Sequence, residues 1–371
     1  MSLLRMIALR AAKGCKAAKG CTAARCSALK CCSAARCTAA VMLLAVMAMM
    51  ASCVHKELCY THPHMLKLRL EFNWRDAELA DPDGMCVFFY PEDGGEYRRF
   101  DFTGRVGGEI EIEAGRYRVL CYNNDTETVV FAGMNNFSTH KVMSYETDIL
   151  SPLGYSSPSY VPRAGEDEKV VKSPEMMWGC TALDVDISEH GITYTCVSRN
   201  DSRGWMQEAV KRDERVITLY PHELVCEYTL EVRNVKNLKY ATQISGILTG
   251  LSPELLLHDE TTGPIPVTLP YECRIEGDKI LAQFYTFGHN TELPDPHCVV
   301  LYIWMTDGKI HCFGIDNERF DVTQQVHTAP DRRHVHLIID GLELPETDGI
   351  GGGGMTPTVD DWGEVIESIL M

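Results

Sequence analysis

Apolar residues that alternate with polar ones constrain the fold of this chain more than any other feature. Between Leu66 and Trp74, leucine or an aromatic residue occupies every second position. A period of two places these side chains on one face of a half-buried β-strand. Turn residues at Asp81–Gly84 separate this segment from the next strand-like one. Because almost no stretch sustains a helical period, the sequence predicts an all-β protein.

Short strands of this kind recur along the chain and are typical of β-sandwiches. We expect them at Met85–Tyr90, Tyr97–Phe102, Glu109–Glu113, Arg116–Tyr122, Leu183–Ile187, Ile192–Val197, Val216–Tyr220, Val225–Val232, Ala241–Leu251, Ile265–Leu269, Ile280–Phe287, Val299–Met305, Lys309–Asp316 and Val335–Ile339. Residues 151–175 are rich in proline and predict a long loop. We place the domain boundary near the polar segment Asn200–Arg215. The prediction is therefore two tandem sandwiches, residues 53–215 and 216–345.

The N-terminus has the layout of a signal peptide. Residues 1–52 form a low-complexity Cys/Ala/Lys leader with basic but no acidic side chains, and an uncharged run from Ala39 to Ser52 ends it. As a helix this run would be about 21 Å long, short of the ~30 Å hydrocarbon core of a bilayer. Met50–Cys53 resembles the lipobox of bacterial lipoproteins. We therefore expect residues 1–52 to be removed and Cys53 to carry a lipid; an ordinary signal peptide cut near Ala51 is the alternative.

Charge and cysteine usage narrow the class of protein. Without the leader, 27 basic residues face 52 acidic ones, which makes the chain a poor partner for nucleic acid or an anionic membrane surface. Nine cysteines follow Cys53, and export would permit disulfides. Their number is odd and several lie in apolar strands, so buried free thiols are at least as well supported as a disulfide framework.

The last residues form a separate segment. Residues 346–371 begin with a glycine-rich linker, after which apolar side chains recur at helical spacing: Val359, Trp362, Val365, Ile366 and Ile369. This pattern predicts an amphipathic tail. It would either dock on its own domain or bind a neighbouring protein.

No catalytic signature is present in the sequence. The chain lacks a G-x-S-x-G elbow, an H-E-x-x-H motif and a P-loop. His334 and His336 lie two residues apart on an expected strand, so both point to one face and are weak metal candidates. The opposite, apolar face is expected to be buried, and the histidines would then simply face solvent. We predict no enzyme, no cofactor and no metal.

Aromatic side chains raise a second possibility. Sugars stack on aromatic rings, and Tyr155 and Tyr160 lie in the expected long loop, where they could form a weak glycan-binding platform. Trp304 lies in an apolar strand and is expected to be part of the core.

Eight segments spread over residues 53–371 carry a family resemblance: Cys53–Tyr60, Phe89–Gly95, Glu113–Asp125, Met176–Cys180, Leu219–Tyr240, Phe284–His289, Ala329–Leu342 and Val359–Val365. They resemble a family of uncharacterised lipoproteins from Bacteroidota that is classified as a domain of unknown function. That family is similar, more distantly, to the anchor and tip subunits of fimbrillin-type pili. The resemblance implies two transthyretin-like β-sandwich domains and strand exchange with fimbrillin-like pilus subunits.

These observations lead to one expected function and one alternative. The expected function is that of a non-enzymatic lipoprotein of the cell envelope, attached to the outer membrane through Cys53 and acting as a fimbrial anchor or tip-like adhesion subunit. It would pair an unpaired strand edge with a partner's strand, which needs no particular side chains. The alternative is a glycan-binding surface lipoprotein.

Overall fold

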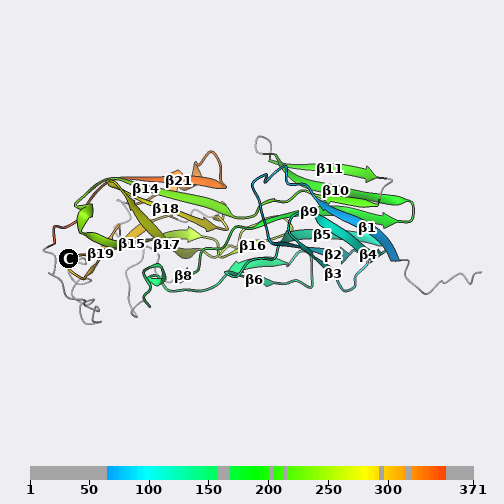
Figure 1. The fold of residues 1–371 in the computed structure, drawn as a ribbon, viewed down its shortest axis with the longest axis horizontal. Helices are drawn as coiled ribbons and strands as arrows, with labels where there is room; N and C mark the ends of the chain where they lie inside the picture. The colour runs from blue at the N-terminus through cyan, green and yellow to red at the C-terminus, as the bar shows by residue number, and fades with distance from the viewer. Residues whose placement is uncertain are drawn as a thin grey trace, which may run out of the picture. The chain divides into compact units, whose positions relative to one another are not determined.

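The structure, a computed structural model, describes residues 65–156, 168–200, 204–212, 215–291, 296–314 and 320–347. Within these ranges almost all regular structure is β-strand, apart from one short α-helix and two 3₁₀ turns. The predicted all-β class is therefore confirmed (Figure 1). The expected leader, Cys53, Tyr160 and the C-terminal tail with Val359, Trp362, Val365, Ile366 and Ile369 lie outside the described residues.

Two facing sheets build the N-terminal sandwich. The larger has the order β11-β10-β9-β5-β2-β3, and the smaller has the order β12-β1-β4. The strands span Met65–Phe72 (β1), Gly84–Pro91 (β2), Arg98–Thr103 (β3), Gly107–Glu113 (β4), Gly115–Asn123 (β5), Trp178–Ser188 (β9), Gly191–Asn200 (β10), Gly204–Arg212 (β11) and Val216–Leu219 (β12).

The alternation seen in β1 explains how these two sheets pack. Leu66, Leu68 and Leu70 are buried, while the residues between them are exposed. The buried face contacts apolar residues of β2 such as Val87 and Phe89. At roughly 1.5–3 kcal/mol for each fully buried side chain, this face supplies much of the driving force for packing.

A third, small sheet covers the outer face of the larger one. It has the order β16-β7-β6 and consists of Val129–Ala132 (β6), Lys141–Ser144 (β7) and Glu254–Leu256 (β16). Because β2 is buried on both faces, Phe88 and Tyr90 pack here against Val142 of β7. These three strands were not predicted from the sequence.

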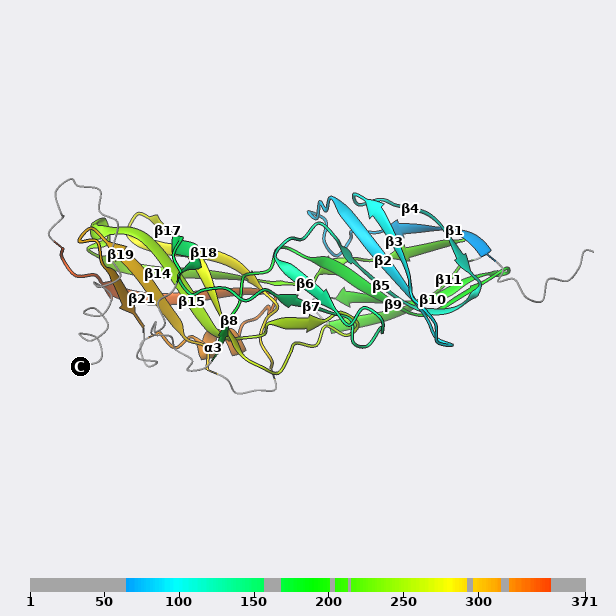
Figure 2. The same cartoon turned by 90° about the horizontal axis from the view of Figure 1, so that it is seen from below.

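The C-terminal sheet runs β20-β19-β15-β17-β18-β14-β21, and β8 pairs with β17. Its strands span Lys169–Val170 (β8), Cys226–Lys236 (β14), Ala241–Leu251 (β15), Val267–Glu276 (β17), Lys279–Thr286 (β18), Val299–Met305 (β19), Ile310–Phe313 (β20) and His334–Glu343 (β21). The strand β17 pairs with β15 between Val267 and Cys273, and with β18 through its last three residues, Arg274–Glu276. The sheet therefore folds over at β17, and its two parts enclose a common core (Figure 2).

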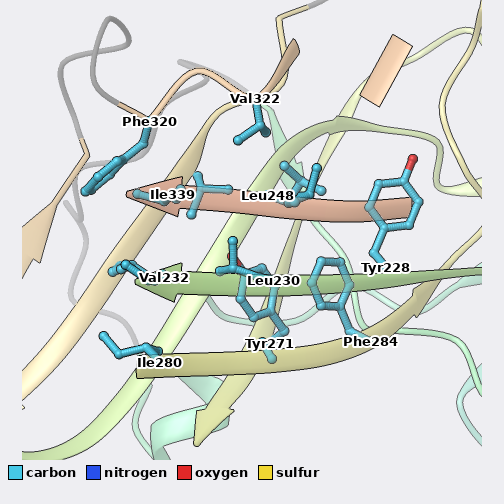
Figure 3. Close-up of a cluster of buried hydrophobic side chains, with 14 of the residues drawn as sticks. Tyr228, Leu230, Val232, Leu248, Tyr271, Ile280, Phe284, Phe320, Val322 and Ile339 are labelled. Carbon is cyan, nitrogen blue, oxygen red and sulfur yellow. The ribbon is translucent and has the colours of Figure 1, made fainter. Parts of the chain in front are cut away.

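Aromatic stacking organises that core (Figure 3). Tyr271 of β17 stacks on Phe284 of β18 with ring centroids 4.1 Å apart and planes 4° from parallel. Gly246 of β15 lies opposite Tyr271, and a Cβ atom there would come within 2.4 Å of the tyrosine ring. The glycine in this strand is therefore required by the ring that packs over it.

Several short elements complete the chain: η1 (Ser151–Leu153), β13 (His222–Glu223), η2 (Leu238–Tyr240) and the helix α3 (Thr323–His327). The first of these, with β8, interrupts the loop expected over residues 151–175. The polar segment expected near the domain boundary contains β11, which forms a hairpin with β10.

The division at residue 215 stays a prediction, and strand pairing crosses it. Val216–Leu219 (β12) pairs in parallel with β1 of the N-terminal sandwich. In the other direction, β8 pairs with β17.

Eight cysteines fall among the described residues, and no two of these eight form a disulfide with each other. Six of them are buried: Cys86, Cys121, Cys180, Cys196, Cys226 and Cys298. Burial raises the pKa of Cys86 to about 12, so this thiol stays protonated and unreactive.

Candidate functional site

Among the described residues, no strand pairs with the outer edge of β21, the last strand of the C-terminal sheet. β21 pairs in parallel with β14 on one side and ends the strand order on the other (Figures 1 and 2). It is ten residues long. An edge of this length offers backbone donors and acceptors to an incoming strand without needing a specific side chain.

The direction of the backbone groups on β21 follows from its hydrogen bonds. The Glu227 N–H donates to the Arg333 carbonyl at 2.6 Å, so the groups of residues at odd-numbered positions face β14. Even-numbered residues, among them His336 and Ile338, therefore direct their backbone groups away from β14.

One of these outward positions is covered by a side chain. Gln325, in the helix α3, donates from its amide to the Ile338 carbonyl at 2.9 Å, and the Ile338 N–H donates to the Gln325 side-chain oxygen at 2.8 Å. The amide thus occupies the place that the backbone of a further strand would take. A short helix that covers an edge in this way is one means of preventing uncontrolled strand pairing.

The edge strand β3 of the larger N-terminal sheet carries charged side chains instead. β3, which ends the larger N-terminal sheet, has exposed Arg98, Arg99 and Asp101, and the Arg99 guanidinium donates to the Asp101 carboxylate at 2.8 Å. Charged side chains of this kind discourage pairing with another strand.

The structure places the two sequence-derived metal candidates on the exposed face of β21. His334 Nδ1 lies 2.8 Å from the Asp331 carboxylate, and His336 Nδ1 lies 2.8 Å from the Thr229 hydroxyl. Among the described residues, no third metal-ligating side chain joins these two histidines.

A buried ion-pair cluster lies directly before β21. The Arg333 guanidinium pairs with the Glu260 carboxylate, whose other oxygen lies 2.6 Å from His222 Nε2. The three side chains are 11%, 10% and 3% exposed. Glu260 has a φ of +57°, a left-handed conformation that is costly for a residue with a Cβ atom. The cluster joins β13, the loop after β16 and the start of β21.

The tyrosine expected in a glycan platform packs on the protein itself. Tyr155 contacts Trp304 edge to face, with ring centroids 5.0 Å apart. Both rings pack against a small core formed by Leu150, Ile247 and Val300. Glycan binding through Tyr155 and Tyr160 stays a prediction.

A second group of histidines, which was not predicted from the sequence, comes together in the structure. His289 follows β18, His297 precedes β19 and His327 ends α3. One potential ligand atom of each lies within 4.8 Å of the others. Burial, together with the neighbouring imidazoles His297 and His327 and the Arg332 charge, lowers the pKa of His289 to about 4, so this ring is neutral at neutral pH. We call these three residues the histidine cluster.

In the part of the chain that the structure describes, no helix is long and apolar enough to cross a membrane.

The described residues define a class of protein: an all-β chain built from sandwich sheets, in which the edge strand β21 lies beside the buried ion-pair cluster. Residues 52–272, more than half of the chain, match the family described as "Domain of unknown function (DUF5119)", and the chain belongs to that family.

Known proteins resemble the chain over most of its length. The protein named "Putative fimbrium anchoring subunit Fim4B" from Bacteroides ovatus is 23% identical, over 85% of this chain and 93% of its own length. A crystal structure of "a putative adhesin" from the same species shares 18% identity over 80% of this chain and 98% of that one, with a TM-score of 0.49. The fimbrial anchor protein Mfa2 from Porphyromonas gingivalis shares 12% identity over 73% of this chain and 90% of its own, with a TM-score of 0.38.

Proposed function

We propose that this chain is a non-enzymatic subunit of a cell-envelope fimbria, of the anchor or tip type. The observation that carries this proposal is the similarity to the fimbrium anchoring subunit Fim4B, because it covers nearly the whole of both chains.

The proposed mechanism is mechanical. A lipid on Cys53 holds the chain at the outer membrane, and the outward-facing backbone of β21 accepts a strand from a pilus subunit. For this to happen, the partner's strand displaces the Gln325 amide from Ile338. The incoming backbone supplies the same donor and acceptor, so the exchange leaves no hydrogen-bonding group of Ile338 unsatisfied.

Side chains around β21 support its use as an edge. Val335, Leu337 and Ile339 are buried against the core, which fixes the strand on its inner side. His334 and His336 are exposed, and their ring nitrogens contact Asp331 and Thr229. An added strand would therefore extend a sheet that is already packed on its inner side.

Co-purification from the native envelope tests the proposal. A tag in the linker at residues 346–354 allows the chain to be crosslinked in cells and recovered with its partners for mass spectrometry. We expect fimbrillin-like β-sandwich proteins in the wild-type sample and their loss with Cys53→Ala. Cys59→Ala, a cysteine six positions further on, is the matched control and should retain them. Recovery of polysaccharide or transporter components without any pilus subunit would refute the proposal.

A further inference from the structure

We propose that His289, His297 and His327 form a binding site for a divalent transition metal, with Zn²⁺ as the preferred ion. The site does not depend on the proposed fimbrial role. It rests on the distances within the histidine cluster and on the orientation of His297.

The spacing of the three rings fits a shared ion. His297 Nε2 and His327 Nε2 are 3.1 Å apart, and all three ligand atoms lie within 4.8 Å of one another. Two nitrogens bound to one tetrahedral Zn²⁺ at the usual ~2.05 Å lie about 3.3 Å apart. The ring centroids form a nearly equilateral triangle, with sides of 5.0, 5.0 and 5.1 Å. Binding of a shared ion would require His289 to turn so that its nitrogen approaches the same centre.

A hydrogen bond to the Thr249 carbonyl fixes the orientation of the His297 ring. Its Nδ1 lies 3.0 Å from the Thr249 carbonyl, which can only accept a hydrogen bond, so Nδ1 carries the proton and Nε2 is the basic nitrogen. Histidines that bind metals commonly donate their other N–H to a carbonyl in this way. His297 is also 1% exposed, so the protein holds the ring firmly.

The backbone makes room for this ring. Gly250 has a φ of +76°, and a Cβ atom at this position would lie 2.7 Å from His297 Nδ1. A residue other than glycine would therefore push the imidazole away from its place. The bulge in β15 between Leu248 and Leu251 is thus shaped around His297.

The donor set selects the kind of ion. Three neutral imidazoles suit Zn²⁺ and neighbouring transition metals, whereas Ca²⁺ and Mg²⁺ require oxygen ligands. His289 also lines a pocket of about 230 Å³, and His327 is exposed, so an ion and a water molecule can reach the centre from solvent. We assign the fourth coordination position to that water.

Metal binding would fasten α3 to the rest of the sandwich. His327 is the last residue of this helix, and Gln325 of the same helix covers Ile338 on β21. A bound ion would therefore hold Gln325 against Ile338 at the edge of β21. This consequence, unlike the site itself, rests on the proposed function.

Metal titration of purified protein tests the site without reference to fimbriae. The full chain, produced without a histidine tag and stripped with a chelator, is titrated with Zn²⁺ against a chromophoric chelator. Co²⁺ then serves as a spectroscopic substitute, because tetrahedral nitrogen coordination gives strong visible absorption. His327→Ala is the informative variant, since an exposed side chain can be removed without disturbing the core. The matched control is His334→Ala with His336→Ala, which removes two exposed histidines from the same part of the chain.

We expect the wild type and the control to bind one Zn²⁺ with the same affinity, and His327→Ala to bind it more than tenfold more weakly and to lose the Co²⁺ bands. Circular dichroism of each protein establishes that it is folded. The proposal is overturned if His327→Ala binds Zn²⁺ as tightly as the control does, or if folded wild-type protein binds no Zn²⁺ in the titration.

Discussion

Replacing Glu260 by glutamine removes one charge from the buried ion-pair cluster while keeping the shape of the side chain. Arg333 would then keep a hydrogen-bonding partner but lose the anion beside its guanidinium, in a place where only 11% of that side chain is exposed. Removing one partner of a buried ion pair typically costs about 3–5 kcal/mol, because the remaining charge is left in a poorly solvated place. Since the glutamine amide can still accept a hydrogen bond, we expect about 3 kcal/mol here.

Urea denaturation followed by circular dichroism measures this effect. We expect the midpoint for Glu260→Gln to fall with no change in the slope. The control is Glu343→Gln, which removes one partner of the exposed pair between Lys236 and Glu343, whose side chains are 70% and 65% exposed. Solvent screens that pair, so its loss should shift the midpoint far less. Equal shifts for the two variants would refute the claim that the cluster holds β21 in place.

Three further predictions follow from single buried groups. Burial and the Arg99 charge lower the pKa of His140 to about 4, so the unfolded chain takes up this proton near pH 6.5 and the folded chain only near pH 4. This titration should therefore lower stability by roughly 3 kcal/mol as pH drops through that window, and His140→Gln should remove that share of the pH dependence in denaturation curves at several pH values. Within the described part of the chain, the buried Tyr271 hydroxyl has no hydrogen-bonding partner, so Tyr271→Phe should raise the unfolding free energy by about 1 kcal/mol, and a lower value would contradict this. Cys86, fully buried, should react with iodoacetamide only after unfolding, and mass spectrometry of native protein would reveal any earlier labelling.

Strands in which apolar and polar residues alternate within the strand itself were predictable from the sequence. Met65–Phe72 was recognised because its leucines alternate with charged residues, and the structure buries that same leucine face. The strand β11 was not recognised, since its polar sequence has no alternating apolar face and its assignment depends on pairing with β10. Strands as short as β7 and β16 contain too few residues to show an alternation of apolar and polar side chains. They also pair with each other across more than a hundred residues of chain, which a local pattern does not reveal.

The functional groups were harder to foresee than the strands. The spacing of His334 and His336 suggested a metal site. In the structure, the strand period of two places both side chains on an exposed face. The histidine cluster has no recognisable spacing, because its members follow one strand, precede another and end a helix. Only the folded chain brings them within reach of one ion.

The central claim is that the outward edge of β21 pairs with a strand of a pilus subunit, and a proline at one position tests it most directly. The His336 backbone points away from β14, so His336→Pro removes an outward N–H while keeping the bonds to β14. His336→Ala loses the same side chain but keeps that N–H. Each variant is expressed in the native bacterium in place of the wild-type chain, and the fimbriae attached to cells are compared with those shed into the medium.

At equal amounts of protein in the envelope, we expect His336→Ala to retain fimbriae on the cell and His336→Pro to shed or lack them. Equal numbers of attached fimbriae with the two variants would contradict strand pairing at this edge.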